Sequence, residues 1–461
     1  MAIKTRRDFL KKTGTGLLAA TMPAIASADP KNTQIIEDLQ KNAGPNDKIR
    51  LAVVGMGIMG YNNLAAAVKV PGVEFVAACD LYDGRLTRAK ELYGDNIATT
   101  RNYRELLDRK DIDAICVATS DHWHDRITID ALNKGKSVYC EKPMVHKIEE
   151  GYAVIEAEKK SGKTLQVGSQ RASSILYHKA AELYKSGAIG QLIIAEANTD
   201  RFSANGAWQY SIPTDASEKT VDWKGFLGDA PVRDFDPLRF FRWRNYQDYG
   251  TGVAGDLFVH LFTGLHVVLG SQGPNRIFAS GGLRFWKDGR DVPDVMLAVV
   301  DYPQTASHAA FNLQIRVNFV DSGGGSNLLR LIGTEGTMEL GWGQIIIKKN
   351  KLDDAPGYGG WDSYETFSSA QQKEYEKWYK AKYPVNYAMK DPGEQIYQTP
   401  DGYDDNVAHW TSFINGIRTG AKVTEDGSFG LRSAGPSLAT NLSYFGNKVI
   451  NWDPVKMAVI S

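Results

Sequence analysis

Cysteine is scarce in this chain, with three residues in 461: Cys79, Cys116 and Cys140. Each lies in or beside an apolar run that is typical of a β-strand, and their spacing fits no common zinc pattern. Small buried thiols behave as core residues. We therefore expect three buried cysteines, no disulfide and no metal site.

An excess of either charge is also missing. Lys and Arg total 54, Asp and Glu total 54, and the formal net charge is zero. A neutral balance gives no reason to expect nucleic acid as a partner. At roughly 150 residues per domain, the length predicts two or three domains.

Membrane-length apolar runs are absent, and the one suggestive stretch lies at the N-terminus. The pair Arg6-Arg7 precedes an apolar run over 16–25, and Ala26-Ser27-Ala28 offers a small-residue cleavage site. This pattern predicts a twin-arginine signal peptide over 1–28, removed on export. An N-terminal anchor helix is the alternative, but the run is too short to cross a bilayer. We expect a soluble periplasmic protein with no membrane attachment after signal removal.

Residues 29–47 are polar and are interpreted as a linker or surface arm. From 48 to 168, apolar strands alternate with amphipathic helices, which predicts a parallel sheet covered on both faces. The expected strands are 49–54, 74–79, 114–118, 137–140 and 164–167, and the expected helices are 62–70, 84–93, 127–134 and 148–161. The fold class is therefore α/β with an N-terminal Rossmann dinucleotide-binding domain.

The pattern changes in residues 169–461, which we interpret as a second α/β domain for substrate binding and oligomerisation. Long alternating strands predict a large, mostly antiparallel sheet with one open face. The expected strands include 192–202, 294–301, 309–317 and 328–332, and the expected helices are 175–185, 254–269, 405–419 and 430–444. Residues 353–403 are predicted to form an inserted lobe of loops and short helices, and the last two helices to finish the fold.

A glycine-rich turn follows the first predicted strand. It reads Gly55-Met56-Gly57-Ile58-Met59-Gly60, and Asp80 ends the next strand twenty residues after the last glycine. Glycines here permit a tight turn and a close approach to a pyrophosphate, and the acid accepts the ribose hydroxyls. The combination predicts a nucleotide site for NAD. NADP stays possible because Arg85 and Arg88 are near in sequence. An ordinary glycine turn is the alternative.

Polar side chains end the next two strands of the parallel sheet. Thr119, His122, Trp123 and His124 follow one strand, and VYCEKPM carries Glu141 and Lys142 at the end of the other. Ligands bind outside the carboxyl ends of parallel strands, so we expect these residues to contact the cofactor. Helix capping by His124 and a surface position for Lys142 are the alternatives.

Together these motifs resemble the Gfo/Idh/MocA family of sugar and polyol oxidoreductases. The resemblance runs from about Lys48 to the C-terminal helices, and its most specific element is the strand-end Glu-Lys-Pro. It implies that Lys142 helps to transfer the substrate proton. A second family signature, Asp256-x-x-x-His260, places both side chains on one helix face. We expect His260 as general base and Asp256 as substrate ligand, although the lysine and histidine roles are interchangeable.

The resemblance also implies that the Gln170-Arg171 junction lies on the nicotinamide side, with Gln170 near the cofactor and Arg171 near the substrate. Aromatic and arginine side chains concentrate between 208 and 249. Of these we predict Arg242, Trp243 and Tyr249 as substrate-binding residues, with core packing as the alternative for the aromatics. Family members often associate through the open sheet, so we expect a homodimer or homotetramer.

The leading hypothesis is an exported oxidoreductase that moves a hydride between bound NAD(P) and a secondary hydroxyl of a sugar, glycoside or polyol. Twin-arginine export carries folded proteins, so we expect a tightly bound cofactor. One alternative is an NAD-dependent glycoside hydrolase that oxidises its substrate transiently, and another is a non-catalytic sugar-binding protein.

Overall fold

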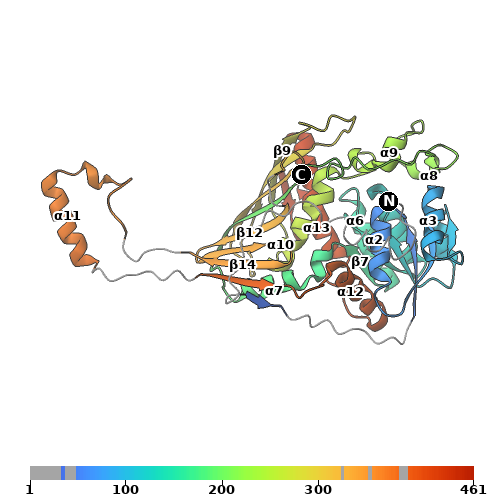
Figure 1. Ribbon diagram of the computed structural model, residues 1–461, viewed down its shortest axis with the longest axis horizontal. Helices are drawn as coiled ribbons and strands as arrows, with labels where there is room; N and C mark the ends of the chain where they lie inside the picture. The colour runs from blue at the N-terminus through green and yellow to red at the C-terminus, as the bar shows by residue number, and fades with distance from the viewer. Residues whose placement is uncertain (1–32, 37–47, 323–325, 351–355, 384–392, 461) are drawn as a thin grey trace.

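The structure is a computed structural model that describes residues 33–36, 48–322, 326–350, 356–383 and 393–460. Two β-sheets with their covering helices make up the body of the molecule (Figure 1). The predicted signal peptide and most of the predicted linker lie outside the described residues. No helix among the described residues combines the length and apolar character that crossing a bilayer requires.

The first sheet is parallel throughout, with the order β4-β3-β2-β5-β6-β7. This order confirms the predicted Rossmann fold, because the strand order reverses between β2 and β5. Its strands are β2 (Ile49–Val54), β3 (Val73–Cys79), β4 (Ala98–Thr100), β5 (Ala114–Val117), β6 (Ser137–Glu141) and β7 (Leu165–Gly168). Its helices are α2 (Ile58–Ala67), α3 (Asp83–Tyr93), α4 (Tyr103–Asp108), α5 (His124–Asn133) and α6 (Glu150–Ser161).

The second sheet is large and mostly antiparallel, with the order β1-β15-β14-β13-β12-β8-β11-β10-β9-β16-β17. Only the pairs β1–β15 and β8–β11 are parallel within this order. Its central strands are β8 (Leu192–Asp200), β9 (Arg276–Gly282), β10 (Val295–Tyr302), β11 (Phe311–Asn318) and β12 (Ser326–Gly333). Further out are β13 (Gly336–Leu340), β14 (Gln344–Lys349), β15 (Glu394–Gln398), β1 (Thr33–Ile35), β16 (Ile450–Asp453) and β17 (Ala458–Ile460).

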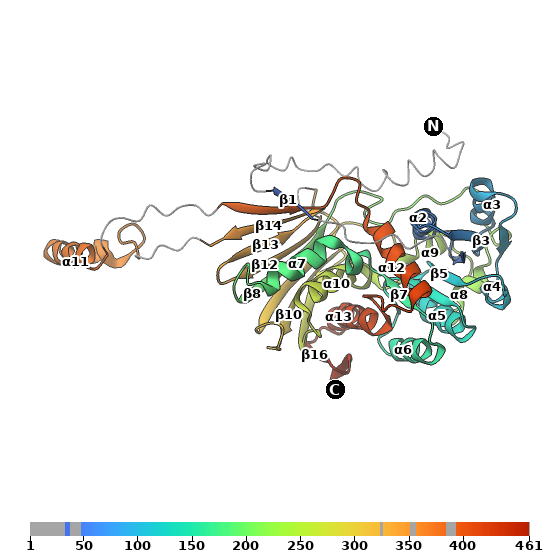
Figure 2. The same cartoon turned by 90° about the horizontal axis from the view of Figure 1, so that it is seen from below.

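Helices cover only one face of the second sheet (Figure 2). They are α7 (Ile175–Lys185), α10 (Val259–Leu269) and α13 (Gly427–Gly446), with α12 (Asp405–Thr419) beside the first domain. On the opposite face, Phe278, Leu297 and Val299 expose roughly half of their surface. The alternation of buried and exposed residues along β10 and β11 therefore confirms the predicted open face.

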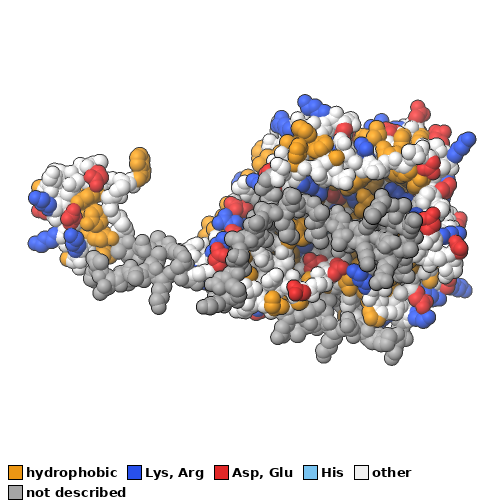
Figure 3. Space-filling view, viewed as in Figure 1, with side chains coloured by type: hydrophobic (Ala, Val, Ile, Leu, Met, Phe, Trp, Pro, Cys, Tyr) orange, Lys and Arg blue, Asp and Glu red, His pale blue; other side chains and the backbone are white. Residues whose placement is uncertain are grey.

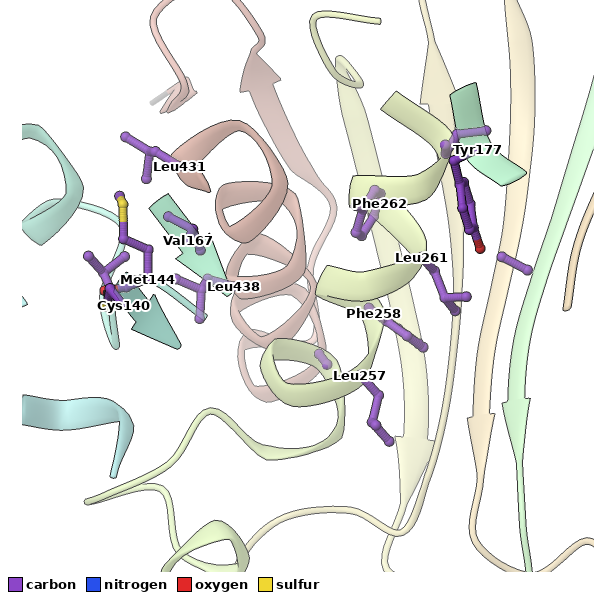
Figure 4. Packing of buried hydrophobic residues seen from close by; sticks show 14 of the residues in the cluster. Cys140, Met144, Val167, Tyr177, Leu257, Phe258, Leu261, Phe262, Leu431 and Leu438 are labelled. Atoms are coloured by element: carbon purple, nitrogen blue, oxygen red, sulfur yellow. The ribbon is translucent and has the colours of Figure 1, made fainter. Parts of the chain in front are cut away.

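Helix α13 joins the two sheets through one continuous apolar core (Figure 4). Leu431 and Leu438 of α13 lie toward Cys140 and Met144 of the first domain, and α10 lies on its other side. All three cysteines are buried and free. This packing fixes the end of β6 against the start of α10.

Three parts of the second domain differ from the sequence-based expectation. Residues 33–35 are strand β1 rather than linker, and 394–398 within the predicted lobe are strand β15 of the main sheet. Strands β16 and β17 follow the last helix, which the sequence predicts to finish the fold. All are short edge segments, whose pairing depends on distant strands rather than on local pattern.

The predicted lobe holds a longer helix than expected, α11 (Ser369–Lys382). It stands apart from the body of the molecule in Figures 1 and 3. A cluster of tyrosines packs around it, including Tyr358, Tyr364 and Tyr375. The lobe is thus held together by aromatic edge contacts of its own.

Candidate active site

A cleft lies where the two domains meet, at the carboxyl ends of the parallel strands. We call it the inter-domain cleft. From the first domain it is lined by Gly55, Gly57, Ile58, Met59, Asp80, Arg85, Thr119, Asp121, Trp123, His124, Glu141 and Lys142, among others. From the second it is lined by Tyr210, Asp222, Gly225, Phe226, Phe240, Phe241, Trp243 and Arg244.

The glycine-rich turn forms the floor of this cleft. Gly55 has φ +93°, and a Cβ there would lie 2.4 Å from the Ala118 carbonyl oxygen. A Cβ on Gly60 would lie 1.9 Å from the Gly55 oxygen, so both positions require glycine. At Gly57 the nearest atom to an added Cβ is 3.8 Å away, on Arg85. Gly57 therefore leaves space for a ligand at the N-terminus of α2, where an anionic group is favoured.

Asp80 closes the turn from the end of β3. Its Oδ2 accepts a hydrogen bond from the Met56 amide at 2.7 Å, and its Oδ1 accepts one from the Tyr82 amide at 2.9 Å. The Arg85 guanidinium lies 3.4 Å away. The carboxylate is thus oriented by main-chain donors while it lines the cleft, as a ribose-binding acid must be.

The polar residues after β5 tie the cleft wall to other elements. Asp121 accepts hydrogen bonds from the amide and hydroxyl of Thr251 at 2.9 and 2.7 Å. His124 is buried, and its two ring nitrogens lie 2.8 Å from the Pro143 oxygen and 3.3 Å from the Thr119 oxygen. Burial lowers the pKa of His124, so the ring stays neutral. Both residues fix the strand ends on which Thr119 and Lys142 lie.

His122 does not line the cleft, in contrast to our expectation of a cofactor contact. Its Nε2 lies 2.9 Å from the Phe226 oxygen and its Nδ1 3.3 Å from the Tyr249 oxygen. Burial lowers its pKa to about 4. The residue joins the two domains instead, whereas its neighbour Trp123 does line the cleft.

Lys142 and Asp256 meet across the domain boundary. The Lys142 Nζ lies 2.9 Å from Asp256 Oδ1 and 2.9 Å from the Asp256 carbonyl oxygen, and the side chains of both residues are only 8% exposed. Arg244 Nε donates to the same Oδ1 at 3.1 Å. Burial alone would raise the pKa of Asp256, but the cations of Lys142 and Arg244 hold it below its ordinary value. Asp256 is therefore a carboxylate shared by two cations.

Glu141 points into the first domain. Its Oε1 accepts a hydrogen bond from Asn63 Nδ2 at 2.8 Å, and Asn63 Oδ1 accepts one from Trp410 Nε1 at 3.2 Å. Burial raises the pKa of Glu141. The chain of bonds from α12 through α2 to β6 fixes the backbone that carries Lys142.

His260 follows Asp256 by four residues, but the turn between them is not a regular α-helix. Residues Ala254–Phe258 form a π-helical turn, a feature found often at functional sites. Burial, together with the charges of Lys142 and Arg171, lowers the pKa of His260 well below its ordinary value. A neutral imidazole is the form that accepts a proton.

The predicted site residues divide into two groups by position. Gly55, Gly57, Ile58, Met59, Asp80, Thr119, Trp123, His124, Glu141, Lys142 and Trp243 line the cleft. Met56 is buried below the turn, and Gly60 lies one helical turn into α2. Gln170 lies at the start of the short helical turn Gln170–Ser173, outside the cleft lining.

The predicted substrate residues Arg242, Tyr249 and Arg171 also lie outside the cleft lining. Arg242 Nε donates to the Tyr210 carbonyl oxygen at 2.8 Å, and Tyr249 is fully buried in an aromatic core cluster. Arg171 Nη1 donates to the His260 carbonyl oxygen at 3.2 Å.

Sequence reasoning missed Arg244, Tyr210 and Asn63. Arg244 is the member of its arginine cluster that reaches Asp256. Nothing in the local sequence separates it from Arg242 two residues earlier. Asn63 lies inside α2, and its partner Trp410 is 347 residues away.

Residues 49–169 match the family model described as "Oxidoreductase family, NAD-binding Rossmann fold". The match covers the first domain and its parallel sheet. The open turn at Gly57, the oriented Asp80 and the helix N-terminus fit a dinucleotide, and they are the features of this domain that would hold one.

Curated relatives share parts of this chain. An inositol 2-dehydrogenase of Salmonella typhimurium is 32% identical over 167 residues, which are 36% of this chain and 49% of that protein. An alpha-N-acetylgalactosaminidase of Shewanella oneidensis is 26% identical over 238 residues, 48% of this chain and 50% of that protein. The chain spans about half the length of the curated relatives it matches.

Solved structures share the fold over both domains. A levoglucosan dehydrogenase in complex with NADH and levoglucosan superposes with a TM-score of 0.60 at 17% identity, covering 88% of this chain and 99% of that one. An aldose-aldose oxidoreductase from Caulobacter crescentus has a TM-score of 0.60 at 16% identity, with 88% and 99% coverage. At such low identity these likenesses show the fold alone.

Proposed function

We propose that this protein is an exported oxidoreductase that transfers a hydride between a secondary hydroxyl of a sugar, glycoside or polyol and bound NAD. One observation carries the proposal: Lys142 of the nucleotide domain, which lines the inter-domain cleft, lies 2.9 Å from Asp256 of the second domain. An amine and a carboxylate converge there beside the predicted nicotinamide end. The dehydrogenases among the relatives support the same class.

The residues divide the work of oxidising a secondary alcohol. Bound NAD⁺ supplies the hydride acceptor for the carbon-bound hydrogen. His260, held neutral by burial and neighbouring cations, takes the hydroxyl proton as the C–O bond becomes a carbonyl. The Lys142 ammonium stabilises the negative charge that develops on that oxygen. Asp256 orients the ammonium and accepts a hydrogen bond from the substrate.

Tight retention of the cofactor is part of the proposal. Residues 208–249, which we call the cover segment, reach from the second domain over the rim of the nucleotide domain (Figure 1). Its helices α8 (Trp223–Leu227) and α9 (Pro237–Phe241) lie next to α3. The Asp222 amide donates to the Leu81 oxygen at 2.8 Å, and Trp123 Nε1 donates to the Phe226 oxygen at 2.9 Å. A nucleotide in the cleft would lie beneath this segment.

NAD is proposed over NADP because the Asp80 carboxylate would repel a 2′-phosphate. Replacing Asp80 with Ser should raise the NADP/NAD ratio of kcat/KM by about tenfold or more, given the size of one charge-assisted hydrogen bond. An unchanged ratio would show that Asp80 does not set the preference.

Export to the periplasm is proposed from the twin-arginine pattern Arg6-Arg7 and the apolar run after it. Fractionation of cells that express the full chain would test it. Replacing both arginines with lysine, Arg6→Lys together with Arg7→Lys, should leave the protein in the cytoplasm. Equal periplasmic recovery of both forms contradicts the proposal.

The decisive experiment for the activity uses the purified full-length protein. Denaturation should release NAD(H), identified by mass spectrometry, and a sugar or polyol should change the absorbance at 340 nm. Neither a bound nucleotide nor turnover with any member of a broad sugar panel would be compatible with the proposal.

A transient-oxidation glycosidase is the second candidate, favoured by the similarity to the alpha-N-acetylgalactosaminidase. Such an enzyme would release an aglycone without net reduction of its cofactor. A chromogenic nitrophenyl glycoside panel distinguishes the two: nitrophenol release with no net NADH favours hydrolysis. Net NADH formation from a free sugar, without nitrophenol release, favours the oxidoreductase.

A further inference from the structure

Arg201 lies immediately after β8. Its guanidinium carbon lies 4.6 Å from the centre of the Phe319 ring. Its Nε and Nη2 atoms are buried and have no hydrogen-bond partner among the residues that the structure describes. A guanidinium is costly to bury without an acceptor, so these two donors require an explanation.

The groups around Arg201 belong to the proposed active site. Arg244, Asp256 and Tyr210 interact electrostatically with Arg201, and so does His260. Burial lowers the pKa of Arg201 and the Asp256 carboxylate opposes that effect. Since Asp256 Oδ1 already receives hydrogen bonds from Lys142 and Arg244, this carboxylate does not supply Arg201 with an acceptor.

Arg171 adds a fourth cation to this region. Its described contacts are the His260 carbonyl oxygen at 3.2 Å and the Tyr177 ring at 5.6 Å. Asp405 acts on Arg171 electrostatically, without a described ion pair between them. Arg171 thus adds positive charge around His260, and Asp405 is an acidic group that acts on it.

Two other acidic groups lie nearby. Glu141 accepts a hydrogen bond from Asn63, and burial raises its pKa. Asp121 Oδ2 accepts from Thr251, while its Oδ1 is buried without a described partner. Lys142, Arg171 and Arg201 act electrostatically on His260, and Lys142 and Arg244 lower the pKa of Asp256. Four cations therefore gather around the carboxylates of Asp256 and Asp121.

We infer that the substrate of the proposed oxidoreductase is an acidic sugar, whose oxyanion is held by Arg201 while Lys142 and His260 act on a neighbouring hydroxyl. This inference rests on the proposed function and names its substrate class. The planar guanidinium fork matches a carboxylate or a phosphate, whereas a neutral hydroxyl would leave the positive charge unmatched. Sugar acids and sugar phosphates share this oxyanion chemistry, and the assay separates them.

The test measures kcat/KM by NADH formation at 340 nm with the purified protein that carries its own nucleotide. The probes are glucuronate, galacturonate and gluconate as sugar acids, glucose 6-phosphate as a sugar phosphate, and glucose, galactose and inositol as neutral compounds. The best anionic probe should exceed its neutral counterpart by on the order of 100-fold. Preference for the acids assigns a carboxylate, and preference for the phosphate ester assigns a phosphate.

Substitution of Arg201 tests whether this residue is the origin of the selectivity. Arg201→Met keeps a stem that can pack on Phe319 and should reduce the anionic-to-neutral ratio of kcat/KM by on the order of 100-fold. Arg201→Lys should restore part of that ratio. The matched control is Arg276→Met, which removes an exposed arginine of β9 that is paired with Asp301 of β10 and should leave the ratio unchanged.

Equal kcat/KM for neutral and anionic sugars would overturn the inference. An anionic-to-neutral ratio of kcat/KM that Arg201→Met does not change would also overturn it. In either case the proposed oxidoreductase activity would stand, because NADH would still form. Absence of NADH with every sugar, by contrast, rejects the proposed function itself. An Arg201→Met protein that fails to fold is recognised by its thermal melt, and the ratio measured with Arg201→Lys then decides.

Discussion

The two sides of the inter-domain cleft treat their polar groups differently. On the nucleotide side, Asp80 and His124 are bonded to groups of the protein itself. On the substrate side, Arg201 keeps buried donors with no described partner. The nucleotide side is thus pre-organised as a scaffold, whereas the substrate side holds charge that a ligand can complete. Binding of the cofactor and turnover of the substrate should therefore be separable by mutation.

The largest expected effect comes from Lys142→Met. Removing the ammonium takes away a proton-transfer and charge-stabilising group, so kcat should fall by about 10²–10⁴. The amount of nucleotide released on denaturation should not change, because Asp80 and the glycine turn are intact. Lys134→Met, an exposed lysine paired with Asp108, serves as the control. Full activity of Lys142→Met would remove the residue from the mechanism.

Gly57→Ala should instead weaken cofactor binding. A Cβ fits the protein at this position but occupies space open to the cleft, so the fold should persist while nucleotide affinity falls by about tenfold or more. Isothermal titration with NAD checks the affinity, and a thermal melt checks the fold.

Gly55→Ala is the comparison that sharpens this prediction. Its φ of +93° and the 2.4 Å approach to Ala118 should lower the free energy of unfolding by about 1–3 kcal/mol or more. If both alanine variants unfold at the wild-type temperature, the turn does not have the geometry described.

The pH dependence of kcat/KM tests the proposed role of His260. Because burial and the charges of Lys142 and Arg171 lower the pKa of His260, the imidazole should stay neutral below pH 6.5. The acid limb of the profile should therefore lie below pH 6.5. Arg171→Met removes one cation and should move that limb toward higher pH. An acid limb above pH 6.5 in the wild type would exclude His260 as the base in this environment.

The smallest effect is expected at Glu425, where the two domains meet. This carboxyl is fully buried, its Oε1 lies 3.4 Å from the Thr263 hydroxyl, and burial raises its pKa well above the ordinary value. A carboxyl whose pKa is raised on folding stabilises the protein below its unfolded pKa, and this stabilisation is lost as pH rises.

Glu425→Gln removes that pH dependence. The variant should melt about 2–4 °C above the wild type at pH 8, and the two should converge near pH 4. A scanning calorimetry series across this range makes the measurement. A variant that is less stable at every pH would mean that the carboxylate form is required for packing.

Most of the nucleotide domain could be predicted from sequence, but its short strand β4 and its short helix α4 were missed. Its longer strands are apolar runs bounded by turn signals. In the second domain, helices α7 and α12 were predicted with the correct bounds because their helical periodicity is strong. The strands β1, β15, β16 and β17 were missed. Each has five residues or fewer, and each depends on a partner strand far away in the chain or on another short edge strand.

For the candidate site, motif residues of the nucleotide domain such as Gly55, Asp80 and Lys142 line the cleft, whereas the motif residues Asp256 and His260 lie outside its lining. Residues chosen for side-chain type alone were mostly wrong. Arg242 and Tyr249 are turned into the protein, while Arg244 and Tyr210 line the cleft. Side-chain direction in an irregular segment is set by tertiary packing, which leaves no periodic signal to read.

Strand β1 has a consequence for the solubility of the chain. Its three residues pair with Ile396, Tyr397 and Gln398 and so occupy the hydrogen-bonding edge of β15. An uncovered edge offers a ready template for another chain to add a strand. Strand β1 therefore covers the edge of β15 and prevents another chain from pairing with it.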